Sequence, residues 1–191
     1  MQTSALIEEF TKHGLRDVGE NYLQEALGKK AQLANLELNW HFIGQIQSNK
    51  TKLIAENFDW VHGVDRLKIA QRLSAQNPQE KPLKILLQIN VDNEPSKGGV
   101  LPNEAGQLCA QIDSLPGIQL CGFTLIPKPR NCATQQRAIF KLARELLYDT
   151  NTRYNLQLNQ LSMGMSQDLE AAIAEGSTLV RVGTDLFGAR T

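Results

Sequence analysis

The 191-residue sequence predicts a β/α barrel of the TIM type in which about seven of the eight strands are present. Short apolar runs, often β-branched, alternate with helical patterns along the chain, as in successive βαβ units with parallel strands. No linker or low-complexity stretch divides this series, so residues 1–191 are expected to form a single domain. Two glycine-bearing segments close the series, where barrels of this type commonly bind phosphate.

Each expected strand is a short apolar run, and each expected helix is a longer stretch with one apolar face. The strands are expected at residues 17–20, 40–44, 60–64, 84–91, 118–126, 160–164 and 178–183. The helices between them are expected at residues 22–33, 48–57, 66–75, 103–115, 134–154 and 167–175. In the last of these helices, Leu169, Ala172 and Ile173 are spaced for one buried stripe.

The chain opens with an expected helix at residues 4–13, ahead of every strand. Leu6, Ile7 and Phe10 are spaced for one helical face, and Gly14 provides a stop. A complete eight-stranded barrel has a strand before its first helix, so this sequence begins one strand late. An open doubly wound sheet is the competing architecture, but residues 18–21 carry one glycine instead of a Gly-x-Gly-x-x-Gly turn. The barrel is preferred.

Composition excludes several classes of function. Lys plus Arg and Asp plus Glu both number 20, so no net positive charge favours nucleic acid as a partner. The three cysteines, Cys109, Cys121 and Cys132, show no C-x-x-C spacing and are expected to be buried or idle thiols. No apolar run approaches the roughly 18 residues of a membrane span, and no signal sequence follows Met1. The expected location is the cytoplasm.

The two glycine-bearing segments, residues 161–166 and 180–184, together resemble a phosphate cup. Each follows an apolar run and supplies hydroxyl groups, flexible backbone and free N–H groups, which a phosphate monoester needs. Alternatively, the glycines at 164 and 183 permit tight turns, and Ser162, Ser166 and Thr184 act as helix caps. Two such segments together favour the phosphate site.

Two further polar residues have a structural and a functional interpretation. Arg181 ends an apolar strand, where its guanidinium needs an acceptor, either Asp185 or Glu20 in an ion pair or a ligand atom such as a ring nitrogen. Asn21 follows the first expected strand and is either a turn residue or a ligand contact.

The histidines suggest no metal site, because His13, His41 and His62 lack the i, i+4 spacing of a helix-borne pair. His41 is expected to be a hydrogen-bonded histidine of the barrel. Ser162 and Ser166 lack the G-x-S-x-G pattern, so no Ser–His–Asp triad is predicted, and no catalytic residue is assigned.

Five ordered motifs resemble one protein family. They are residues 19–25 (GENYLQE), 40–50 (WHFIGQIQSNK), 162–166 (SMGMS), 181–184 (RVGT) and 187–190 (FGAR). They closely resemble the pyridoxal phosphate homeostasis proteins, which are single-domain relatives of the N-terminal barrel of alanine racemase. The resemblance implies a fold-type III barrel that binds pyridoxal 5′-phosphate (PLP) without established catalysis. It further implies a monomer that buffers PLP or delivers it to PLP-dependent apoenzymes.

The resemblance also assigns roles to residues. Ser162, Gly183 and Thr184 would hold the phosphate, and Arg181 would face the pyridine nitrogen. Asn21 would border the cofactor, while Gly164 and Ser166 would shape the cup. An arginine at the ring nitrogen keeps the ring unprotonated and weakens it as an electron sink, which suits a carrier or a mild racemase-like site.

One departure from the family concerns its Schiff-base lysine, which belongs to a Ser-Lys-Thr-Lys-like segment on the first strand. This sequence has no such segment before residues 4–13; Lys50 and Lys52 belong to a different motif and are expected to be solvated. We expect that Met1 is an internal methionine of a longer reading frame that encodes the first barrel strand. The alternative is that the protein naturally lacks this strand. An amino-acid racemase-like enzyme and a remnant unable to bind PLP covalently remain alternative functions.

Overall fold

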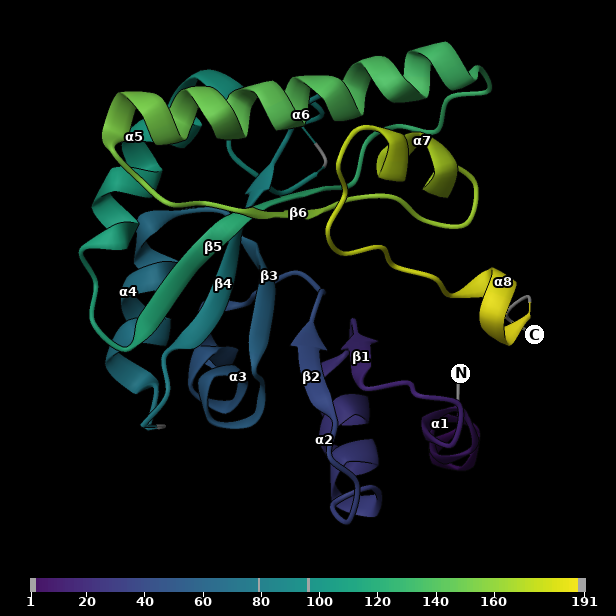
Figure 1. Ribbon diagram of the computed structural model, residues 1–191. Coiled ribbons are helices and arrows are strands. Elements are labelled where there is room, and N and C mark those ends of the chain that lie inside the picture. The colour runs from purple at the N-terminus through teal and green to yellow at the C-terminus, as the bar shows by residue number, and fades with distance from the viewer. Residues whose placement is uncertain (1–2, 79, 96, 189–191) are drawn as a thin grey trace.

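The computed structural model describes residues 3–78, 80–95 and 97–188, and its framework is one parallel sheet. The strands are β1 (Asp17–Glu20), β2 (Asn39–Phe42), β3 (Trp60–Val64), β4 (Leu83–Ile89), β5 (Ile118–Leu125) and β6 (Gln160–Ser162). Each strand pairs in parallel with the next strand of the sequence, in the order β1-β2-β3-β4-β5-β6 (Figure 1). This order is the winding of a β/α barrel, as predicted.

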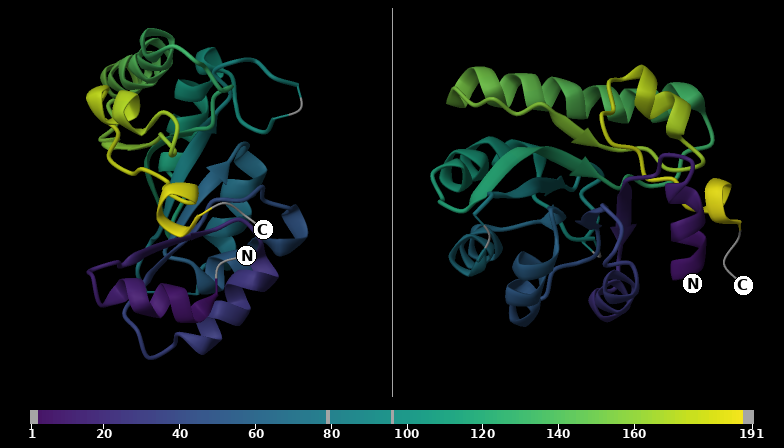
Figure 2. Two further views of the ribbon diagram at one scale, coloured as in Figure 1. Left: turned by 90° about the vertical axis from the view of Figure 1, so that its right-hand side faces the viewer. Right: turned by 60° about the horizontal axis from the view of Figure 1, so that its bottom comes forward.

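Helices connect the strands and cover the outside of the sheet (Figure 2). They are α1 (Ser4–Thr11), α2 (Leu23–Gln32), η1 (Ser48–Lys50), α3 (Thr51–Asn57), α4 (Leu67–Gln76), α5 (Pro102–Asp113), α6 (Ala133–Tyr154), α7 (Leu169–Ala174) and α8 (Thr184–Phe187). Most agree with the predicted helices to within two residues. The short helix α8 was not predicted, because its four residues show no apolar period.

The sheet curls into a half-barrel. His62 on β3 and Ser162 on β6 are three strand spacings apart, which is about 14 Å in a flat sheet, yet their side chains are hydrogen-bonded at 2.9 Å. The first and last helices, α1 and α8, come together beside the open side, where Phe10 of α1 packs edge to face on Phe187 of α8 (Figures 1 and 2). The curl therefore directs side chains of distant strands onto one concave face.

The apolar core lies between the convex face of the sheet and the helices. In β4, Leu83, Ile85, Leu87 and Ile89 alternate with the other residues and belong to one large buried cluster. Leu86 is fully buried but does not belong to this cluster. Alternation along a strand separates its two faces, so the concave face is a separate environment from the main core.

The seventh expected strand, residues 178–183, is not a strand in the structure. Leu179 forms a single bridge with Ser162. The hydroxyl groups of Ser177 and Thr178 hydrogen-bond to the carbonyl of Leu161, which also accepts from the backbone N–H groups of residues 178 and 179. Side-chain hydroxyls that bond to nearby backbone compete with a regular ladder. The segment follows the sheet edge without extending the sheet.

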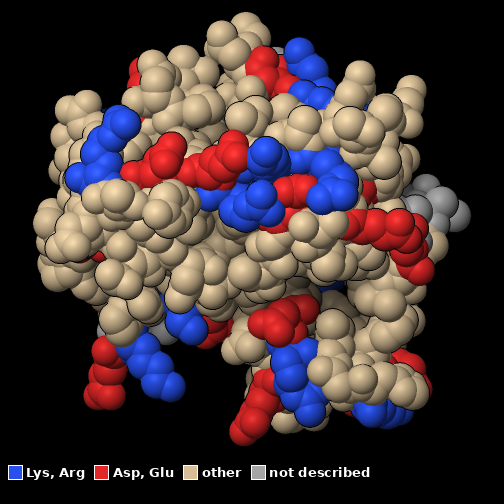
Figure 3. Space-filling view, turned by 45° about the horizontal axis from the view of Figure 1, so that its top comes forward, with Lys and Arg blue, Asp and Glu red and all other residues tan. Residues whose placement is uncertain are grey.

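The surface mixes both signs of charge. On the face that carries α6, Lys and Arg side chains lie among Asp and Glu side chains (Figure 3). Glu175 forms ion pairs with Arg137 and Arg144. Cys109 and Cys121 are buried and Cys132 is exposed; all three are free thiols. In the described part of the chain, no helix has the length and apolarity needed to cross a bilayer.

Candidate functional site

The candidate site lies where β5 and β6 end and the segment after β6 crosses them, with Arg181 as its central side chain. Arg181 Nη1 donates to the carbonyl oxygen of Ser162 at 2.7 Å, to the Ser162 hydroxyl at 2.7 Å and to Thr124 Oγ1 at 3.3 Å. Its Nη2 donates to the carbonyl oxygen of Leu125 at 2.7 Å. These bonds fix the plane of the guanidinium against two strand ends.

Among the described residues, every hydrogen-bond acceptor of Arg181 is neutral. Within residues 3–78, 80–95 and 97–188 no carboxylate forms an ion pair with it, and burial lowers the pKa of Arg181 to about 10. Glu20, one of its two expected partners, instead pairs with Lys29. A guanidinium that keeps its charge without a carboxylate attracts an anionic or electron-rich ligand.

Ser162 is more deeply buried than a residue that contacts a phosphate group needs to be. Its side chain is fully buried, and its hydroxyl is already hydrogen-bonded to Arg181 and His62. The assignment of Ser162 to the phosphate stays a prediction. In this structure the residue holds Arg181.

The two glycine-bearing segments do lie side by side. Arg181 N–H donates to the carbonyl of Gly164 at 3.0 Å, and Asp185 N–H approaches the Ser166 hydroxyl at 3.4 Å. Gly164 has a φ of +93°, and an added Cβ would lie 2.5 Å from the Cβ of Ala172, so both turn and packing require glycine there. An added Cβ at Gly183 would meet nothing within 4 Å, which leaves open space beside its backbone.

The remaining predicted residues lie at the edge of this arrangement. Thr184 begins α8, and its side chain lies outside the described part of the structure. Asn21 is exposed just after β1, with its backbone packed against Gly44. Among the described residues, no hydrogen bond joins Asn21 to Arg181, so its place beside a ligand stays a prediction.

A chain of hydrogen-bonded side chains crosses the concave face. It contains Asp17, His41, His62, Ser162 and Arg181, and we call it the concave-face relay. The His41 Nε2 lies 3.1 Å from an Asp17 carboxylate oxygen, and the His41 Nδ1 lies 3.0 Å from the His62 Nε2. His62 Nδ1 lies 2.9 Å from the Ser162 hydroxyl, which in turn meets Arg181. His41 is thus a hydrogen-bonded histidine of the barrel, as predicted.

Both histidines of the relay are neutral at neutral pH. Burial lowers the pKa of His62 to about 2, with further lowering by nearby His41 and Arg181. Burial also lowers the pKa of His41, against the opposing influence of Asp17. The ring of His41 stacks on Trp60 at a centroid distance of 5.5 Å, which helps to keep water away.

The neutral state of His62 predicts weaker stability in acid. The unfolded chain takes up a proton as the pH falls below about 6.5, whereas folded His62 does not, so the free energy of unfolding falls by up to about 1.4 kcal/mol per pH unit. We expect His62→Gln to flatten this dependence between pH 6 and 4, measured by urea unfolding. His13→Gln, at an exposed position outside the relay, is the control for the removal of a histidine. An unaltered slope in His62→Gln would show that His62 is charged in the folded protein.

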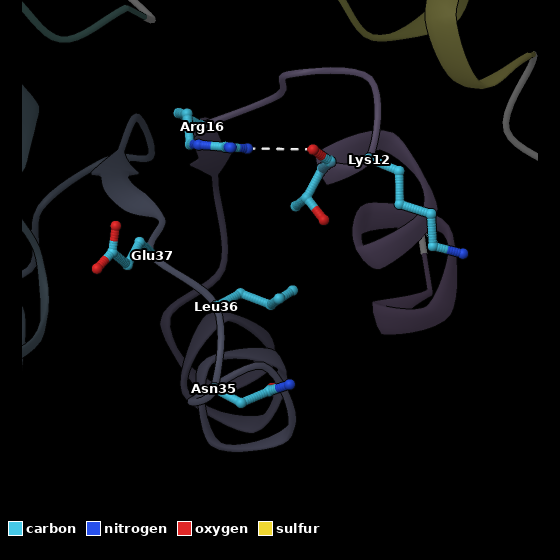
Figure 4. A pocket seen from close by; sticks show the side chains of 6 residues that line it. Lys12, Arg16, Asn35, Leu36 and Glu37 are labelled. Carbon is cyan, nitrogen blue, oxygen red and sulfur yellow. Dashed lines mark hydrogen bonds between the residues drawn. The ribbon is translucent and has the colours of Figure 1, made fainter.

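Two surface hollows lie among the described residues, one beside α6 and α7 and the other beside α1. The larger, about 550 Å³, is lined by α6 and α7 together with Ser166 and Asp185, so it borders the candidate site from outside. The smaller, about 260 Å³, lies between α1 and the segment before β2 (Figure 4), where Arg16 donates to the carbonyl of Thr11. The smaller hollow shares no residue with the candidate site.

Sequence reasoning missed two members of the relay, Asp17 and His62, and also Thr124, whose hydroxyl accepts from Arg181. A weak signal was available, since a polar residue that could face away from the apolar core occurs in each of the first three strands, namely Asp17, His41 and His62. What the sequence does not reveal is the curl that brings β3 beside β6. The contact between His62 and Ser162 spans 100 residues of sequence.

The chain is similar to characterised families in sequence and in structure. Residues 3–191 match the family model described as alanine racemase, N-terminal domain. A pyridoxal phosphate homeostasis protein from Pseudomonas aeruginosa is 57% identical over 188 residues, which cover 98% of this chain and 80% of the relative. A solved structure of PipY from Synechococcus elongatus, with PLP bound, has a TM-score of 0.90 at 38% identity and covers 98% of this chain and 88% of that one.

The likeness extends to a larger enzyme at the level of the fold. An alanine racemase from Clostridium difficile has a TM-score of 0.80 at 14% identity, covering 98% of this chain and 48% of the racemase. At that identity the likeness shows the fold alone. By its family match and its identity to the Pseudomonas relative, the chain belongs to the alanine racemase N-terminal-domain family and, within it, to the pyridoxal phosphate homeostasis proteins.

Proposed function

We propose that this chain is a PLP-binding protein of intracellular PLP homeostasis, which buffers or delivers the cofactor without catalysing a reaction on it. The observation that carries the proposal is the Arg181 guanidinium, which has only neutral acceptors among the described residues and lies beside the two glycine-bearing segments. Relatives of high identity are named for the same role.

The residues present fit a phosphate monoester. Ser166 supplies a partly accessible hydroxyl, and the backbone beside Gly183 is open enough for close approach. The backbone of Thr184 begins a helix, whose first N–H groups have no partner inside the helix. We assign Ser162, Gly183 and Thr184 to the phosphate, with Ser166 as a further hydroxyl contact and Gly164 shaping the turn; Ser162 also supports Arg181.

Arg181 is assigned to the pyridine ring. Its guanidinium keeps a nearby ring nitrogen unprotonated, because a second positive charge beside it is unfavourable. PLP supplies an electron sink when bound, and an unprotonated ring nitrogen weakens that property. This pairing supports storage of the cofactor over catalysis, and Asn21 is assigned to the rim of the site.

The proposal covers assembly as well. We treat residues 1–191 as one domain that acts as a monomer in the cytoplasm and transfers PLP to apoenzymes that depend on it.

The racemase alternative has support from the match to the alanine racemase N-terminal-domain model and from fold likeness. A coupled assay for D-alanine formation from L-alanine distinguishes the two, and turnover above the PLP-only background would favour the enzyme.

Titration of the purified chain with PLP, followed by visible absorbance and equilibrium dialysis, tests the proposal. We expect saturable binding at one site, with competition by inorganic phosphate. Borohydride treatment and peptide mass mapping then report whether a lysine is attached, and we expect no lysine to be labelled stoichiometrically. Failure to bind PLP in dialysis would refute the proposed function.

The phosphate assignment makes a quantitative prediction. Thr184→Ala and Ser166→Ala should each weaken PLP binding by about 1 kcal/mol and at most about 3 kcal/mol, because each removes one hydrogen bond to a charged group. Dialysis measures the dissociation constants. Ser114→Ala is the matched control. Ser114 follows α5, and its hydroxyl donates to the carbonyl of Gln111. An unchanged affinity in Thr184→Ala would remove Thr184 from the site.

A further inference from the structure

The concave-face relay has a group of fixed hydrogen-bonding role at each end. The Arg181 guanidinium has five N–H donors and no acceptor, whereas the Asp17 carboxylate has acceptors only. Between these ends lie Ser162, His62 and His41, and each of them can both donate and accept. The Ser162 oxygen can accept two hydrogen bonds, so the Arg181 end is compatible with either direction, and the Asp17 end decides the direction while both rings are neutral.

The direction follows bond by bond. Arg181 donates to the Ser162 hydroxyl, which is then free to donate its own hydrogen to His62 Nδ1. A neutral His62 that accepts at Nδ1 carries its hydrogen on Nε2 and donates to His41 Nδ1. His41 then carries its hydrogen on Nε2 and donates it to Asp17. All four bonds are satisfied with both rings neutral.

The opposite direction fails at the Asp17 end. If His62 donated from Nδ1 to Ser162, its Nε2 would have to accept from His41 Nδ1. A neutral His41 would then present a bare Nε2 to the Asp17 carboxylate at 3.1 Å, which places two acceptors face to face. Unpaired acceptors beside one another in a partly buried place are costly.

We propose that the concave-face relay is directed from Arg181 to Asp17, with both histidines in the Nε2–H form, and that it positions the Arg181 guanidinium for the ring of the cofactor. The second half of this proposal rests on the proposed function. His41 and His62 are 5% and 4% exposed, so these rings cannot reorient freely in the folded protein. The Asp17 side chain is 58% exposed and can be replaced without opening the core. Asp17 is thus a positioning residue at the far end of the relay.

Long-range ¹H–¹⁵N NMR of the histidine side chains tests the direction in the cofactor-free protein. We expect an unprotonated Nδ1 and a protonated Nε2 for His41 and for His62. The exposed His13 provides the internal reference, and His13→Gln, His41→Gln and His62→Gln assign the three spin systems. An Nδ1–H form of either relay histidine at neutral pH would overturn the directed relay.

Asp17→Ala tests the positioning role. Water at the vacated place can donate or accept, so we expect mixed tautomers of His41 and His62 and PLP affinity about two- to tenfold lower, as for loss of one ordering hydrogen bond. Asp17→Asn retains an acceptor oxygen, so it should largely keep the single tautomers of His41 and His62 and the PLP affinity of the parent chain. Asp149→Ala, at an exposed position of α6, is the matched control.

The outcomes separate this proposal from the proposed function. Inorganic phosphate lacks a ring, so its affinity should be equal in Asp17→Ala and in the parent chain, while PLP affinity falls. If the parent chain binds no PLP, the proposed function fails, yet NMR still decides the direction of the relay. If PLP binds equally to both chains while the tautomers change, the positioning role is wrong. Equal loss of phosphate and PLP affinity would likewise overturn it in favour of a general structural effect.

Discussion

Arg181→Met is expected to weaken PLP binding by about 1.5 to 3 kcal/mol, or roughly 10- to 150-fold in the dissociation constant, because it removes charge-assisted hydrogen bonds at the site. Methionine has a similar length, so the apolar part of the side chain is retained. Arg181→Lys keeps the charge and loses the planar fork, and its affinity should fall between those of the parent and Arg181→Met. Equilibrium dialysis at fixed ionic strength measures all three.

The same substitution leaves carbonyl groups of Ser162 and Leu125 without their partner, so the melting temperature must be measured in parallel. Dialysis is then run well below the lowest melting temperature. Arg153→Met, at an exposed position near the end of α6, is the matched control and should bind like the parent. Parent-like PLP affinity in a folded Arg181→Met protein would remove Arg181 from the site.

Gly122→Ala is expected to destabilise the fold by about 3 kcal/mol or more, which lowers the melting temperature by roughly 6–12 °C in a domain of this size. An added Cβ at Gly122 would lie 1.9 Å from the carbonyl oxygen of Gln160 on β6. Backbone of a paired strand cannot give way as a flexible side chain can. The register also shifts between Ile85 and Leu86, where β4 meets β5, so the glycine lies at an irregularity of the sheet.

Gly28→Ala is the matched control for this experiment. Gly28 lies within α2, and an added Cβ there would meet nothing within 4 Å. Alanine loses less conformational entropy than glycine in a helix, so this variant should be more stable by about 0.5–1 kcal/mol. Thermal unfolding by circular dichroism measures both variants. A Gly122→Ala protein as stable as the parent would mean that β5 and β6 do not approach as closely as described.

The order of strands and helices was determined by the sequence alone. Apolar runs and helical periods are local patterns, so β1 to β5 and the helices between them were predicted to within a few residues. The exception, residues 178–183, depends on a competition that no local pattern reveals. There the hydroxyl of Ser177 donates to the carbonyl of Met163, and the backbone N–H of Arg181 donates to the carbonyl of Gly164 instead, so the strand-like pairing stops after Leu179.

For the candidate site, too, the sequence identified some residues and the tertiary structure decided their surroundings. The glycine-bearing segments and Arg181 carry composition and motif signals, so they were identified from the sequence. Their surroundings were decided by the tertiary structure: the curl of the sheet brings β3 beside β6, buries Ser162 against His62 and provides neutral acceptors for Arg181. Contacts between residues 100 positions apart depend on sheet curvature, which arises from the packing of all strands and helices together. The direction of the relay follows only once those distances are known.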